Sequence, residues 1–122
     1  MILAVVVGLA GAFGAVARYV VDGAVADRSR GLFPWGTLTV NVLGSVLLGI
    51  LTGLVVHHGL SAHAELVGGT GLCGGLTTWS TFSWETIALV EDGAGRQAVA
   101  NVAVGLGASI AAGAIGMALG SL

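Results

Sequence analysis

The chain has 122 residues, of which 56% are hydrophobic and 8% are charged, and its formal net charge is -2. Soluble domains average roughly 25% charged residues, so this composition excludes a water-soluble protein and predicts an integral membrane protein. No basic patch is present, so no nucleic-acid partner is expected. The single cysteine, Cys73, excludes an internal disulfide.

Four helices of about 20 residues fit within this length, because that is the number needed to cross the hydrocarbon core. We therefore expect an all-α membrane protein with one domain over 1–122 and transmembrane helices at about 2–22, 36–56, 64–91 and 96–120. Arg18 lies near the end of the first helix. Two interpretations are open: its side chain extends to the membrane interface, or it lines a vestibule and attracts anions.

The second helix follows the only proline, Pro34, which is a favourable residue at a helix start. Thr37, Asn41 and Ser45 are spaced four apart, so they share one face of this helix. An asparagine in mid-membrane needs a partner. Asn41 either forms a hydrogen bond between helices or offers amide N–H groups to a passing anion, and the pattern favours neither.

The third segment contains a glycine-rich and hydroxyl-rich stretch from Gly68 to Glu85. Regular helix is weakest at glycine, so we expect this segment to be broken near 74–78. Polar, irregular backbone at membrane depth occurs where it is buried in protein or lines a watery path. Its free carbonyl groups are able to hold a cation. We therefore expect the functional part of the protein here.

Aromatic and acidic residues follow the predicted break. Trp79 and Phe82 are three apart and face the same way. The positive edges of their rings are able to attract a poorly hydrated anion, although aromatic residues in membrane helices also simply pack. Glu85 lies four residues after Thr81. It is a functional candidate because ionisable groups in membrane segments are rare.

The last helix carries Asn101, Gly105 and Ser109 at spacing four, a possible continuation of the polar track. The glycine pairs Gly49/Gly53 and Gly116/Gly120 have the GxxxG spacing of close helix packing.

All the arginines outside the first helix lie in or beside the first and third connections, which share one side of the membrane; they are Arg28, Arg30 and Arg96. The positive-inside rule then places both termini outside.

Three motifs, in order, resemble those of the Fluc (CrcB-type) fluoride channels. Residues 11–19, GAFGAVARY, resemble the family's Gly-x-x-Gly-Ala-x-x-Arg-Tyr opening. Residues 36–44, GTLTVNVLG, resemble its Gly-Thr-Leu-x-Val-Asn-x-x-Gly segment. Residues 71–82, GLCGGLTTWSTF, resemble its Gly-Phe-Cys-Gly-Gly-x-Thr-Thr-Phe-Ser-Thr-Phe signature. The resemblance covers nearly the whole chain.

This resemblance implies a fluoride-selective channel of the cell membrane that exports cytoplasmic fluoride passively. It implies a dimer of four-helix subunits inserted antiparallel, with two pores and a structural sodium ion held by the backbone carbonyls of Gly74 and Thr77. The expected partners are fluoride, a second subunit and the lipid bilayer. The anion pore is expected to involve Asn41, Trp79, Phe82, Glu85, Thr37, Thr81, Asn101, Ser109 and Arg18.

The chain departs from the family pattern at two positions. Trp79 stands where the family has phenylalanine, and Asn101 stands where it often has tyrosine. The one-sided arginines are awkward for a subunit that must insert both ways. A heterodimer with an oppositely biased homologue is one resolution.

Two other functions remain open. A small four-helix multidrug transporter needs a membrane-buried acid in its first helix, whereas Asp22 lies at the end of ours. A non-conducting partner subunit of a fluoride channel is the other. No enzyme is expected, because no nucleophile, base and orienting group occur together.

Overall fold

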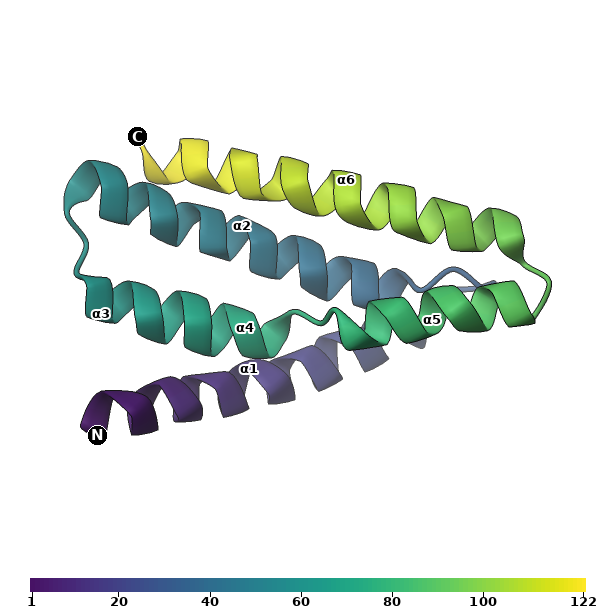
Figure 1. Cartoon of the computed structure of the whole chain (residues 1–122), viewed down its shortest axis with the longest axis horizontal. Coiled ribbons are helices and arrows are strands. Elements are labelled where there is room, and N and C mark those ends of the chain that lie inside the picture. The colour runs from purple at the N-terminus through teal and green to yellow at the C-terminus, as the bar shows by residue number, and fades with distance from the viewer.

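The computed structural model describes all residues, 1–122, and contains helices but no strand, which confirms the all-α class. The elements are α1 (Ile2–Ala26), α2 (Trp35–His58), α3 (Ala62–Glu65), η1 (Leu66–Cys73), α4 (Gly74–Leu76), α5 (Ser80–Glu91) and α6 (Gly95–Gly120). Three of them, α1, α2 and α6, are long and apolar enough to cross a membrane. The elements α3 to α5 together form a third, interrupted segment. In Figure 1 this segment lies in space between α1 and α2.

The long helices extend somewhat beyond the predicted ends. Helix α1 continues to Ala26, because residues 23–26 contain no proline or cap that would stop it. Helix α2 ends at His58, where Gly59 takes a left-handed conformation with φ of 67°. Glycine adopts this conformation at little cost, so it is a common helix terminator.

Helix α2 packs most extensively against α6. The contact is close because glycines face backbone: a Cβ on Gly49 would lie 2.8 Å from the amide nitrogen of Met117. On the other helix, Gly116 and Gly120 lie against the backbone at Val46 and Ile50. The predicted role of both glycine pairs in helix packing is confirmed.

The interruption of the third segment lies at the end of the range predicted for it, 74–78, and is shorter than expected. Helical backbone continues through the glycines to Leu76, as a π-helix over η1 and then α4, and it is interrupted at residues 77–79. The glycines serve close packing against α1: a Cβ on Gly71 would lie 2.8 Å from the Val7 carbonyl. This packing holds the helix together where intrinsic propensity is weakest.

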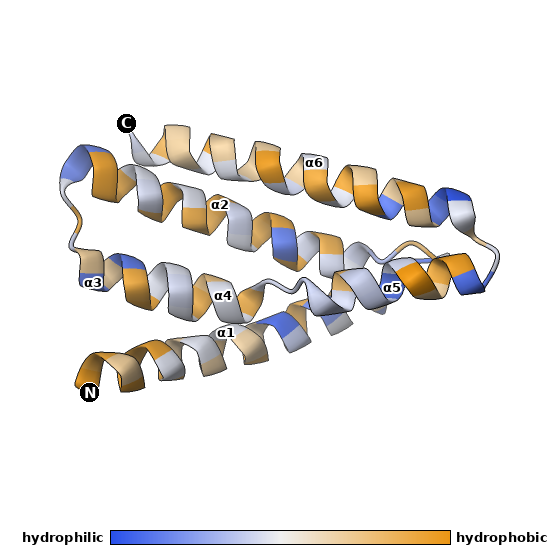
Figure 2. Ribbon diagram, viewed as in Figure 1, coloured by the Kyte–Doolittle hydropathy of each residue, from blue (hydrophilic) through white to orange (hydrophobic).

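The outer surface is apolar along the length of the molecule. Helix α1 buries only Gly14, and large apolar side chains are exposed on every long helix. Figure 2 shows hydrophilic bands at both ends and, on α1 and α2, at the level of the interruption. Such a surface suits lipid or another subunit, whereas the polar groups inside mark the site.

Candidate functional site

Side chains from two helices bind the interrupted backbone. Asn41 on α2 accepts a hydrogen bond from the Thr78 amide (2.7 Å) and donates one to the Thr78 carbonyl (3.0 Å). Arg18 on α1 donates from Nη1 to the Thr77 carbonyl (3.2 Å). Buried backbone groups need partners, and these three bonds supply them where helical bonds are missing. We call Arg18, Asn41 and the backbone of Thr77 and Thr78 the clamp.

Thr78 also starts α5. Its Oγ1 accepts a hydrogen bond from the Thr81 amide (3.1 Å) and donates one to Thr81 Oγ1 (3.0 Å). A threonine side chain that bonds the amide three residues later is a typical N-terminal cap. The sequence Thr78–Thr81 therefore restarts the helix directly after the clamp.

A cavity of about 320 Å³ adjoins the clamp. Helix α2 contributes Asn41 and Ser45, helix α6 contributes Ser109, and the third segment contributes Trp79 and Phe82. After its bond to Thr78, the Asn41 amide retains one N–H, and each serine hydroxyl is a donor. The cavity thus combines hydrogen-bond donors with aromatic rings, which is a suitable lining for a small anion.

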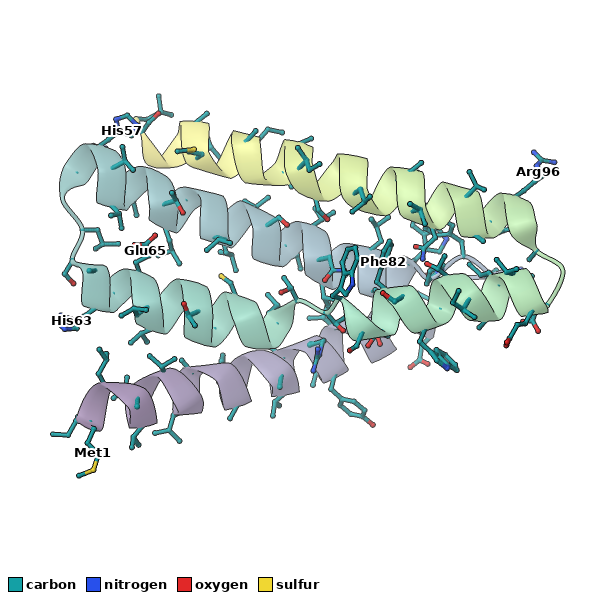
Figure 3. All side chains as sticks on the ribbon, viewed as in Figure 1. Met1, His57, His63, Glu65, Phe82 and Arg96 are labelled. Atoms are coloured by element: carbon teal, nitrogen blue, oxygen red, sulfur yellow. The ribbon has the colours of Figure 1, made fainter.

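The two aromatic side chains differ in their surroundings. Their ring centroids are 5.2 Å apart with an interplanar angle of 40°. Phe82 is 7% exposed and points from α5 into the bundle (Figure 3), where Gly105 makes room for it: a Cβ there would lie 2.9 Å from the ring. Trp79 is 69% exposed on the single chain. The wall that Trp79 forms is therefore open on one side.

A second cavity of about 200 Å³ shares Thr78 with the first, because this residue lines both. Arg18, Thr37 and Thr81 line it. Although Thr37 shares a helix face with Asn41, the structure places it in this second cavity. Arg18 fits neither of its two interpretations fully, because it is half-buried and its guanidinium is bound to the clamp.

Asn101 lies outside both cavities. It is 1% exposed, and its Nδ2 donates to Thr86 Oγ1 (2.9 Å), which joins α6 to α5. Its contacts are those of a hydrogen bond between helices. The structure therefore separates Asn101 from Ser109, although the two share a face of α6.

The carbonyls expected to hold sodium fit an oxygen-ligated cation. In a continuous helix the Thr78 amide would bond the Gly74 carbonyl, but here it bonds Asn41, so the Gly74 carbonyl lacks its usual donor. The Thr77 carbonyl accepts from Arg18 and has a second lone pair. Gly74 is exposed on the single chain, so its carbonyl is accessible to a second subunit.

Residues 5–117 match the family model described as "CrcB-like protein, Camphor Resistance (CrcB)". The chain belongs to the CrcB family. A Streptomyces avermitilis protein named "Fluoride-specific ion channel FluC 1" is 53% identical over 84% of this chain and 87% of its own. A Clostridium novyi protein named "Fluoride-specific ion channel FluC" is 41% identical over 100% of this chain and 96% of its own. A Frankia casuarinae protein, also named "Fluoride-specific ion channel FluC 1", is 49% identical over 88% of this chain and 88% of its own.

As a member of the CrcB family with three apolar spanning helices, the chain is a multi-pass membrane protein. Its relatives in this family are named as ion channels and not as enzymes. Sequence reasoning did not single out Thr78, whose backbone and hydroxyl are both central to the site. The spacing of Thr78 and Thr81, a cap pattern directly after a glycine run, was the available signal.

Proposed function

We propose that this chain forms a fluoride-selective channel through which cytoplasmic fluoride leaves the cell passively. The names of the relatives support the choice of ion. The observation that carries the proposal is the cavity beside the clamp, which Asn41, Ser109 and Phe82 all line. Fluoride is small and strongly hydrated, so hydrogen-bond donors must replace its water.

The path that we propose joins the two cavities past Thr78. Fluoride first meets Ser109 and Asn41 beside the rings of Trp79 and Phe82. It then passes to the second cavity, which Thr37, Thr81 and Arg18 line, and leaves near Glu85. In this scheme Asn101 holds α5 and α6 in place and does not touch the ion.

We further propose an antiparallel dimer with two such pores. The open side of Trp79 and the exposed Gly74 support a second subunit at this face. A sodium ion bound by the Gly74 and Thr77 carbonyls of both subunits would neutralise their partial charges and fix the two interruptions together. Because the arginines are one-sided, a heterodimer with an oppositely oriented homologue is the alternative to a homodimer.

Fluoride efflux from liposomes tests the proposal. The purified chain is reconstituted into liposomes that contain potassium fluoride. Valinomycin is added so that potassium leaves together with fluoride and no membrane potential opposes the efflux. External fluoride is read with an electrode. We expect rapid fluoride efflux and no chloride efflux in a parallel chloride assay. The measurement is made with the chain alone and with an added homologue.

Each alternative function has its own outcome in this assay. Efflux only with the homologue, at a rate above that of the homologue alone, would support the heterodimer. A rate that never exceeds the homologue's own would identify a non-conducting subunit. Proton-driven uptake of a lipophilic cation without fluoride efflux would identify a multidrug transporter and reject the proposal.

A further inference from the structure

Several hydroxyl groups of this chain are bonded to the backbone of their own segment. Thr39, Thr77, Ser83 and Thr86 each donate to the carbonyl of the residue four positions earlier, over 2.7–3.0 Å. Such a bond satisfies the hydroxyl where there is little water. A hydroxyl that does not form this bond, and that belongs to a residue lining a cavity, keeps its proton for another acceptor.

Ser45 on α2 carries a hydroxyl of this second kind. The residue is half-buried and lines the cavity of about 320 Å³, and its Oγ forms no hydrogen bond within the chain. The oxygen is not enclosed either, because the buried side-chain oxygens without a partner are those of Thr37 and Glu85. Ser45 therefore retains a free donor at the cavity.

Ser109 on α6 has the same character, since it lines the same cavity and its hydroxyl has no partner in the chain. Helices α2 and α6 run in the same direction (Figure 1). Gly113, one turn beyond Ser109, lies beside Ser45: a Cβ on Gly113 would lie 3.8 Å from the Ser45 carbonyl oxygen. Ser109 is therefore at a level between Asn41 and Ser45. Because these two residues of α2 are four apart, the series of donors spans about 6 Å along the cavity.

A series of donors suits a small anion that must leave water. The Asn41 amide retains one N–H after its bond to Thr78, and one donor is too few to replace a hydration shell. The two serine hydroxyls supply more, and no acidic residue lines this cavity to repel an anion. We propose that Ser45, together with Ser109, binds the permeating fluoride one turn from Asn41, on the side away from the second cavity. This assignment rests on the proposed fluoride channel and extends its path.

The position of Ser45 also indicates what it does for the ion. Beyond Ser45 on α2, the next residue that lines the cavity is Leu48, whose side chain has no hydrogen-bond donor. An ion beside Leu48 still needs its water. Ser45 is therefore the place where donors of the protein begin to replace that water, before the ion reaches Asn41.

Removal of the hydroxyl separates this role from a structural one. Ser45→Ala deletes a donor that has no partner in the chain, so we expect the temperature of thermal unfolding to stay unchanged. Fluoride efflux from liposomes should fall by about three- to tenfold, the factor that one neutral hydrogen bond provides. With graded internal fluoride, the half-saturating concentration should rise, because the ion loses a contact. Ser45→Thr keeps the hydroxyl and should retain efflux within about twofold of wild type.

Thr52→Val is the matched control. Thr52 lies on the same helix, is also half-buried and lines neither cavity. Valine removes the hydroxyl and keeps the shape, so efflux and the half-saturating concentration should equal those of wild type. If Ser45→Ala does not yield a stable protein, Ser45→Cys, kept reduced, takes its place, because a thiol has a similar shape and is a weak donor.

The possible failures of this inference and of the proposed function differ in the wild type. Normal efflux through a folded Ser45→Ala variant, beside a conducting wild type, would overturn the role of Ser45 and leave the channel standing. A loss of stability that matches the loss of efflux would also overturn it, because the hydroxyl would then bond the protein. A wild type that conducts no fluoride, alone or with a homologue, would reject the proposed function and the role of Ser45 with it.

Discussion

Two asparagines, the half-buried Asn41 and the buried Asn101, show how hydrogen-bond partners decide a residue's role. Asn41 and Asn101 both lie on polar helix faces, and sequence alone assigned both to the anion path. In the structure, Asn41 binds both backbone groups of Thr78 at the edge of a cavity. Asn101 binds the Thr86 hydroxyl away from it. Loss of the two side chains should therefore affect stability alike and conduction differently.

We expect Asn41→Ala to lower fluoride efflux by about tenfold or more, because the clamp and a pore donor are lost together. Asn101→Ala is the matched control and should retain efflux. Each variant should lower the free energy of unfolding by about 1–3 kcal/mol, the cost of leaving buried groups unpaired. The measurements are liposome efflux and thermal unfolding. Equal loss of efflux in the two variants would contradict the distinction.

A second residue-scale prediction concerns Trp79. Trp79→Phe keeps a ring edge at the cavity, so we expect efflux within about twofold of wild type, whereas Trp79→Ala should reduce it by roughly tenfold. Trp84 is exposed on α5, the helix that follows Trp79, but lines neither cavity, so Trp84→Ala is the control. If Trp79→Ala conducts normally, the ring has no part in the path.

At the scale of elements, the third segment combines close packing with a local interruption. Gly71 and Gly75 bring η1 and α4 onto α1, and the chain then leaves the helix at Thr77, whose ψ is 161°. Packing decides that the glycines stay helical, and the bonds from Asn41 and Arg18 accompany the interruption that follows. The prediction of a break was right in kind, and its range of 74–78 overlaps the observed interruption at 77–79.

Gly75 tests the packing of this segment. A Cβ at Gly75 would collide with the Gly11 backbone, so Gly75→Ala should destabilise the chain by about 1–3 kcal/mol, as overpacked interiors do. Gly95, at the start of α6, has open space around it, so Gly95→Ala should leave stability unchanged or raise it slightly. Thermal unfolding in detergent compares the two. A stable Gly75→Ala variant would show that α1 and α4 are free to separate.

On the scale of the whole molecule, arginine and histidine lie at opposite ends. Arg96 lies at one end of the bundle, and His57 and His63 lie at the other, beside the termini (Figure 3). The connection that carries Arg28 and Arg30 is at the arginine end (Figure 1). The fold therefore preserves the one-sided arginine distribution that sequence predicted.

We expect the chain expressed alone to insert mostly with the arginine end in the cytoplasm, because positive residues are retained there. Leu32→Cys and Ser121→Cys, each in a Cys73→Ala background, report the two ends. An impermeant thiol reagent applied to intact cells should label Ser121→Cys, and should label Leu32→Cys only after permeabilisation. Equal labelling of both from outside would show both orientations and favour a homodimer.

What the sequence determined by itself was the class of protein, its helical segments and the identity of its chemical groups. Hydrophobicity and glycine spacing are local properties, so they predict spans and close packing without coordinates. Only the tertiary structure decided which polar groups meet. It joined Asn41 to Thr78, turned Arg18 to Thr77 and moved Asn101 away from the cavity. These contacts cross distances of 15 to 59 residues along the chain, and residue periodicity within one helix carries no information about them.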